Sequence, residues 1–168
     1  MRSYHRLLDR IVAGDANPPA VVEALRLPGI DGWAADGRVW GTWEVDPVVV
    51  GPGGVFGGYL AAVADSYSGV CMYTVLEDGQ WLATRELTTR FLLPVTGGRV
   101  RTESTVVRTE GRRVWVDTVF TTDDGLKVCT AQAVQVVVAR KPAAGAPPHP
   151  TSPPASRPTT PVLPQVTP

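Results

Sequence analysis

Hydrophobic and polar residues alternate along the second half of the chain. Four segments of strand-like length follow one another, and they cover residues 81–95, 99–111, 112–125 and 126–140. Turn signals separate them at Gly97-Gly98, Glu110-Gly111 and Asp124-Gly125. Threonine and charged residues alternate with valine, so one face of each strand should be solvated and the other buried. The pattern predicts four consecutive antiparallel strands arranged as a meander.

The segment before these strands has helical spacing instead. From Leu60 onward, apolar residues recur at Leu60, Val63, Ala64, Tyr67 and Cys71. A further strand is expected at 38–46, where β-branched and aromatic residues lie between Gly37 and Pro47. A helix that is apolar over most of its surface is stable when a sheet covers it. We therefore expect an α+β fold in which a curved antiparallel sheet wraps around one central helix.

The two ends of the chain differ from this middle part. Residues 1–37 should form an N-terminal helical cover, with an amphipathic helix from Tyr4 to Val12 and a shorter one from Pro19 to Leu25. The sheet-and-helix domain should occupy 38–140. The remaining segment, 141–168, holds ten of the sixteen prolines. We expect it to be a disordered, partly polyproline II tail, either passive or able to dock to a partner.

Composition and charge exclude several classes of function. The chain has 16 Lys and Arg against 16 Asp and Glu, without the basic stripe of a nucleic-acid-binding protein. Neither a signal peptide nor a run long enough to span a membrane is evident, so a cytoplasmic location is expected. The only histidines are His5 and His149, which argues against a zinc site, any other metal site or a Ser-His-Asp triad. Cys71 and Cys129 are expected to be buried free thiols.

Candidate chemistry gathers at the start of the apolar helix, in the segment GGVFGGYLAAVADSYSG at 53–69. A helix N-terminus presents unpaired N–H groups and a partial positive charge, and Gly57 and Gly58 have no side chain to block them. These amides could form an oxyanion hole. The alternative is that the glycines only permit a tight turn or close packing against the sheet.

Asp65 is the second candidate, because no other acidic residue occurs between Asp46 and Glu77. It is either a functional carboxylate or an ordinary surface or capping residue. Asp65 lies eight residues after Gly57, which is about 12 Å along a helix axis. One helix cannot bring both groups to one reacting centre. If they cooperate, the carboxylate must come from a second copy of the chain across a two-fold interface.

Three quoted segments carry a resemblance to a known family: GPGGVFGGYLAAVADSYSG, LATRELTTRFLLPVTGGRV and EGRRVWVDTVFTTDDGLKVCTAQAVQVVV. Together, from about Arg38 to Val138, they resemble the hotdog-fold acyl-CoA thioesterases of the phenylacetate-pathway (PaaI-like) branch. The resemblance implies that two chains pair into a continuous double sheet, with an acyl-CoA site at the dimer interface. It also implies that dimers can pair into tetramers, and that no cofactor is needed beyond the coenzyme A of the substrate.

The resemblance also suggests roles for single residues. The Gly57 amide would polarise the thioester carbonyl, Asp65 would act as nucleophile or as general base on water, and Thr84 would hold the water or the carboxylate. The residues expected to contact substrate are Val50, Phe56, Gly58, Ser68 and Arg112. Arg112 sits in an arginine-rich hairpin that would either meet the phosphates of coenzyme A or form an ordinary solvated turn.

Two departures from the family pattern leave two functions open. Phe56 stands where the family usually has His, and Val50 stands where many members have Asn or Gln. The first hypothesis is a thioesterase acting on an acyl-CoA, or alternatively on an acyl-carrier-protein thioester. The second is a hotdog protein that binds acyl thioesters without cleaving them. A dehydratase-type hotdog protein would need a His-carboxylate pair, for which the folded region has no suitable histidine.

Overall fold

The structure, a computed structural model, describes residues 2–139; the predicted Pro-rich tail at 141–168 lies outside the described residues. The helical elements are α1 (Ser3–Val12), α2 (Ala20–Ala24), the 3₁₀ turn η1 (Pro47–Val49) and α3 (Gly57–Met72). The strands are β1 (Gly32–Ala34), β2 (Arg38–Glu44), β3 (Val50–Gly51), β4 (Gly54–Val55), β5 (Gln80–Phe91), β6 (Arg99–Glu110), β7 (Arg113–Thr122) and β8 (Lys127–Ala139).

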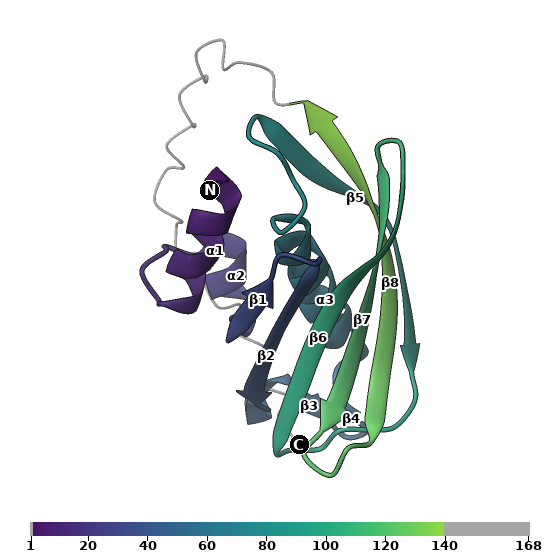
Figure 1. The fold of residues 1–168 in the computed structure, drawn as a ribbon. Coiled ribbons are helices and arrows are strands. Elements are labelled where there is room, and N and C mark those ends of the chain that lie inside the picture. Colours follow the sequence, from purple (N-terminus) through teal and green to yellow (C-terminus); the bar gives the residue numbers. More distant parts are fainter. Residues whose placement is uncertain (1, 140–168) are drawn as a thin grey trace, which may run out of the picture.

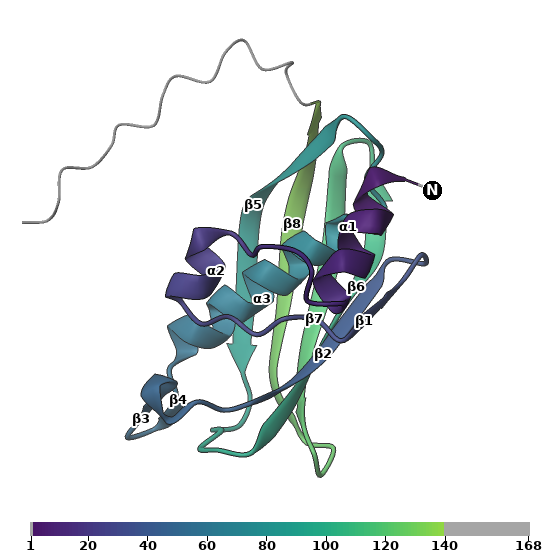
Figure 2. The same cartoon turned by 90° about the vertical axis from the view of Figure 1, so that its left-hand side faces the viewer.

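Six of the strands form one antiparallel sheet in the order β1-β2-β6-β7-β8-β5. The sheet curves around α3, which lies across its inner face (Figures 1 and 2). β3 and β4 form a separate two-stranded ribbon just before α3. The expected α+β architecture, with a curved antiparallel sheet around one central helix, is confirmed.

The predicted meander is wrong in one respect, the position of β5. This strand pairs with β8 at one edge of the sheet, while β6 lies between β2 and β7. Gly97-Gly98 is therefore not a hairpin turn. The carbonyl of Gly98 accepts a hydrogen bond from the N–H of Val45 at 2.9 Å, which extends the β2–β6 ladder. Because β5 and β6 are not neighbours in the sheet, the connection between them is longer than a hairpin loop.

The core lies between α3 and the inner face of the sheet. The helix contributes a buried face made of Leu60, Val63, Ala64, Tyr67, Cys71 and Met72. The strands contribute valines and Phe120 at alternate positions, as the period of two requires. Both predicted N-terminal helices are present, and α1 packs against this core through the fully buried Leu8. Tyr4 of α1 also stacks on Tyr73, with ring centroids 5.1 Å apart.

A β-bulge interrupts β5 between Thr84 and Glu86, where Arg85 has no partner on β8. Thr84 lies opposite Gln135 and Leu87 lies opposite Ala133, which is buried. An extra residue shifts the alternation of side chains by one position. The bulge therefore lets both Thr84 before it and Leu87 after it face the helix.

Candidate active site

The start of α3 presents two backbone N–H groups without acceptors. The N–H of Phe56, which caps the helix, donates to the carbonyl of Val49 at 2.8 Å. Among residues 2–139, the N–H groups of Gly57 and Gly58 have no such acceptor. Free amides at the positive end of a helix dipole attract an oxygen that carries negative charge. The helix start can thus hold an oxyanion through the two glycines, but not through Phe56.

Two aromatic rings flank these amides and lie close to where a side chain at either glycine would begin. A Cβ on Gly57 would lie 3.0 Å from the ring of Phe91, and one on Gly58 would lie 2.6 Å from the ring of Phe56. Phe56 is 71% exposed and Phe91 is 55% exposed. Exposed apolar residues that gather in one patch can mark a surface where a ligand or another chain binds.

A cavity of about 680 Å³ opens beside the helix start. Three predicted substrate-binding residues line it: Val50, Phe56 and Gly58. The C-terminal end of α2 and the η1 turn complete its wall, and these were not predicted. Tyr59 ties the segment after α2 to this wall, because its hydroxyl donates to the carbonyl of Arg26 at 2.7 Å. Burial raises the pKa of Tyr59, so the hydroxyl stays a donor at neutral pH.

Asp65 lies further along α3 in a hydrogen-bonded cluster with three other side chains. The Thr84 hydroxyl donates to Asp65 Oδ1 at 2.8 Å, and the Ser68 hydroxyl donates to the Asp65 carbonyl at 2.9 Å. Gln135 of β8 contacts both hydroxyls, with distances of 3.2 Å to Thr84 Oγ1 and 3.0 Å to Ser68 Oγ. Asp65 itself is exposed, so water or a second chain can reach the carboxylate that Thr84 orients.

The predicted residues separate into two groups within one chain. Gly57 packs against Phe91, which pairs with Cys129 on β8, whereas Asp65 lies at the level of Gln135 on the same strand. Arg112 lies beyond Asp65, at the β6–β7 hairpin, and its carbonyl accepts from Val137 of β8. From Cys129 to Val137 the strand advances about 26 Å. The chain therefore brings Asp65, Ser68 and Thr84 together, and does not bring Gly57 or Arg112 to them.

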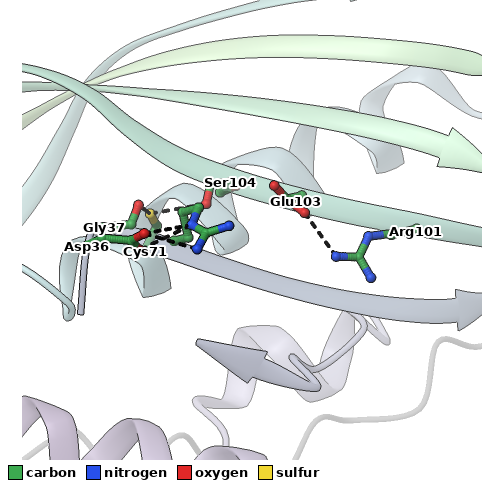
Figure 3. A network of polar contacts seen from close by, with 7 residues as sticks. Asp36, Gly37, Cys71, Arg101, Glu103 and Ser104 are labelled. Atoms are coloured by element: carbon green, nitrogen blue, oxygen red, sulfur yellow. Dashed lines mark hydrogen bonds and ion pairs between the residues drawn. The ribbon is translucent and has the colours of Figure 1, made fainter. Parts of the chain in front are cut away.

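The two thiols are unsuited to catalysis. Cys71 donates to the carbonyls of Gly37 and Ser104 at 3.2 and 3.5 Å (Figure 3). Burial raises the pKa of Cys71 to about 12 and that of Cys129 to about 11, so both stay protonated at neutral pH. Residues 2–139 contain no cluster of three His, Cys, Asp or Glu side chains that could hold a metal ion.

Comparison with known proteins gives the fold family. Residues 52–129 match the family model described as the thioesterase superfamily. A phenylacetic acid degradation-related protein of Ralstonia eutropha JMP134 is similar in structure, with a TM-score of 0.67 and 27% identity over 77% of this chain and 98% of that one. A thioesterase of Haemophilus influenzae has a TM-score of 0.68 and 20% identity, over 79% of this chain and 90% of that one.

The chain has the hotdog fold. A mutant thioesterase of Pseudomonas aeruginosa has the same fold, with a TM-score of 0.67 and 20% identity over 79% of this chain and 94% of that one. No curated protein matches the chain. The hotdog family match supports thioester hydrolysis as the general chemistry. None of the helices formed by residues 2–139 is long and apolar enough to cross a membrane.

Sequence reasoning missed two parts of this hotdog site. The α2 segment was expected only as a cover, yet Ala24, Leu25 and Arg26 line the cavity. Gln135 was not singled out at all. It is a polar residue at an inward position of β8, because Ala131, Ala133 and Gln135 share one face and all three are buried. The alternation of side chains along that strand is the signal that could have identified it.

Proposed function

We propose that this protein is a homodimeric acyl-CoA thioesterase whose active site combines the start of α3 in one subunit with Asp65 of the other. One observation carries the proposal. The Thr84 hydroxyl donates to Asp65 Oδ1 at 2.8 Å and so orients this exposed carboxylate. The N–H of Gly57, which has no acceptor among residues 2–139, lies on the same helix, α3. Because eight residues of helix separate the two by about 12 Å, a second copy must supply one of them.

The proposed reaction uses three groups of the chain. The carboxylate of Asp65 takes a proton from water, and the resulting hydroxide oxygen attacks the thioester carbonyl. The Gly57 N–H stabilises the negative charge that develops on the carbonyl oxygen. The carbon–sulfur bond then breaks, and the coenzyme A thiolate recovers the proton from Asp65. In the alternative route, Asp65 attacks the carbonyl directly and the carbon–sulfur bond breaks, which releases the coenzyme A thiolate to take a proton from solvent. Water then hydrolyses the mixed anhydride and restores the Asp65 carboxylate.

The substrate class follows from the cavity and from the arginine-rich hairpin. The cavity is walled largely by apolar groups, including Val50 and Phe56, which suits an aliphatic or aromatic acyl group. Arg112 is exposed beyond Asp65, where it could meet the phosphates of coenzyme A. An acyl-carrier-protein thioester is the alternative substrate. The likeness to the Ralstonia protein related to phenylacetic acid degradation supports placement in the PaaI-like branch.

The proposed dimer forms through β5. This strand has 12 residues and lies at one edge of the sheet, so its outer hydrogen-bonding groups can pair with a second copy. The strand ends in an exposed apolar segment, in which Phe91, Leu92 and Leu93 are 55%, 50% and 46% exposed. Pairing of β5 with its two-fold mate would continue the sheet and cover this apolar surface. We also propose that the dimers pair into tetramers, that the protein is cytoplasmic and that it needs no cofactor.

The direct test is thiol release from a panel of short-chain, long-chain and aryl acyl-CoAs. The wild-type protein should release thiol from at least one class, and Asp65→Asn should lower kcat about 10²- to 10⁴-fold. Glu86→Gln is the matched control, because it also converts an exposed carboxylate into an amide, on β5 near Thr84. Turnover by Asp65→Asn at the wild-type rate would disprove the role of Asp65.

A non-catalytic acyl-thioester binder is the second candidate. Two observations support it. The N–H of Phe56 already donates to the carbonyl of Val49, and Val50 stands where many family members have Asn or Gln. The helix start then has fewer polar groups than the family pattern provides. Saturable binding of an acyl-CoA by calorimetry, without thiol release from any substrate, would favour this function over hydrolysis.

A further inference from the structure

Gln135 is an unusual residue for the inner face of this sheet. Its side chain is fully buried between β5 and β7. The other buried polar side chains among residues 2–139 are hydroxyls of serine and threonine. A primary amide is unfavourable in an apolar core unless hydrogen bonds satisfy it. The partners of Gln135 should therefore reveal why an amide is present.

The hydroxyl of Ser68 fixes the orientation of the amide. Ser68 donates its single proton to the carbonyl of Asp65 at 2.9 Å. Its oxygen can then only accept from Gln135, whose Nε2 lies at 3.0 Å. The nitrogen of Gln135 consequently faces Ser68, and Oε1 faces Thr84 on the opposite side.

Thr84 thus has two acceptors for one proton. Asp65 Oδ1 lies 2.8 Å from Thr84 Oγ1, and Gln135 Oε1 lies 3.2 Å from it. A carboxylate is the stronger acceptor while it is charged. Once Asp65 has taken a proton or formed an anhydride, its charge is lost and the amide oxygen becomes the better acceptor. The hydroxyl can then turn to Gln135. In the general-base route its oxygen can at the same time accept a hydrogen bond from the proton on Asp65.

We propose that Gln135 is a positioning residue for the reaction, which acts through Thr84 and supplies the second acceptor for its hydroxyl proton. This inference rests on the proposed thioesterase function. Gln135 is buried behind Thr84 and is not among the residues that line the cavity, so its effect should fall on kcat and not on KM. The bulge at Arg85 contributes, because it keeps Thr84 directly opposite Gln135 while the later residues of β5 change face.

The test compares Gln135→Met with a matched control. Methionine has a similar length but neither donates nor accepts as an amide does, so kcat should fall about tenfold with KM unchanged. Thr118→Val is the control, since it also removes a buried hydrogen bond of the inner face, that between Thr118 and Ser104 at 2.6 Å. The control should lose stability without losing kcat.

A double variant separates action through Thr84 from a general effect. In a Thr84→Val background, Gln135→Met should cause no further loss of kcat, because the Thr84 hydroxyl through which Gln135 acts has been removed. Ser68→Ala serves as the second variant if Gln135→Met does not fold, since it frees the amide to rotate. It should show the same lack of additivity. Additive losses, a raised KM, or an equal fall of kcat in Thr118→Val would overturn the proposal.

A measurement independent of turnover completes the design. Scalar couplings of the Thr84 methyl group report the χ1 rotamer, which should be single in the wild-type protein and averaged in Gln135→Met. If the wild-type protein cleaves no acyl-CoA, the proposed function fails, yet this coupling still decides whether Gln135 positions Thr84. An unchanged coupling in Gln135→Met would overturn the inference even if the thioesterase function holds.

Discussion

At the scale of single residues, the backbone N–H groups at the helix start differ in whether they have an acceptor. Phe56 donates to Val49, while Gly57 and Gly58 have no acceptor among residues 2–139. The departure from the family pattern at Phe56 therefore leaves the glycine amides in place. The proposed oxyanion role therefore falls on the Gly57 N–H, which a single substitution can remove.

Gly57→Pro should remove that N–H and leave the helix intact. Proline is well tolerated at the first position of a helix, and the φ of −57° and ψ of 126° at Phe56 suit a residue that precedes proline. The loss of one oxyanion donor should lower kcat about 10²- to 10³-fold. Steady-state kinetics and circular dichroism would measure the two effects.

Gly57→Ala is the control, because it adds the same Cβ at 3.0 Å from the Phe91 ring but keeps the N–H. It should retain most of the wild-type kcat. Equal losses in the two variants would show that crowding against Phe91 is responsible, and not the missing donor.

At the scale of elements, the bulge in β5 decides which side chains reach the helix. Thr84 lies before the extra residue, Arg85, and Leu87 lies after it, yet both face α3. A regular strand would place one of the two on the outer face. The Asp65–Thr84 cluster and the packing of the second half of β5 therefore depend on one inserted residue.

Deletion of Arg85 should turn Leu87 and the residues after it to the wrong face. The free energy of unfolding should fall by about 2–4 kcal/mol, because buried apolar contacts are lost. Arg85→Ala leaves the bulge in place and removes only an exposed side chain, so it should be nearly neutral. Urea denaturation measures both, and equal stability of the two variants would contradict the structural role of the bulge.

The elements themselves were largely predictable from the sequence. Periodicity located α3 and the long strands, because each buries one regular face. The order of strands was not predictable in the same way, since Gly97-Gly98 has the local chemistry of a turn whatever β6 pairs with. Asp65 was identifiable as the one acidic residue in an apolar segment, and Thr84 came from the family resemblance. Gln135 instead depends on contacts between strands and a helix that are distant in the sequence.

At the scale of the whole molecule, the proposed site is divided between two places on the chain. The free amides and the cavity lie at the start of α3, and the Asp65 cluster lies further along the same helix. Among residues 2–139, no strand pairs with the outer edge of β5. A symmetric pairing through that edge would create two identical sites, each with Gly57 from one subunit and Asp65 from the other.

Subunit complementation tests this shared site most directly. Asp65→Asn and Gly57→Pro should each be nearly inactive alone, but a mixed dimer has one site with both an intact Gly57 and an intact Asp65. Random one-to-one mixing makes half the dimers mixed, so about a quarter of wild-type activity should return. If both groups served one site within a single chain, no mixed dimer would contain an intact site. Activity that stays at the level of the separate variants would contradict the shared site.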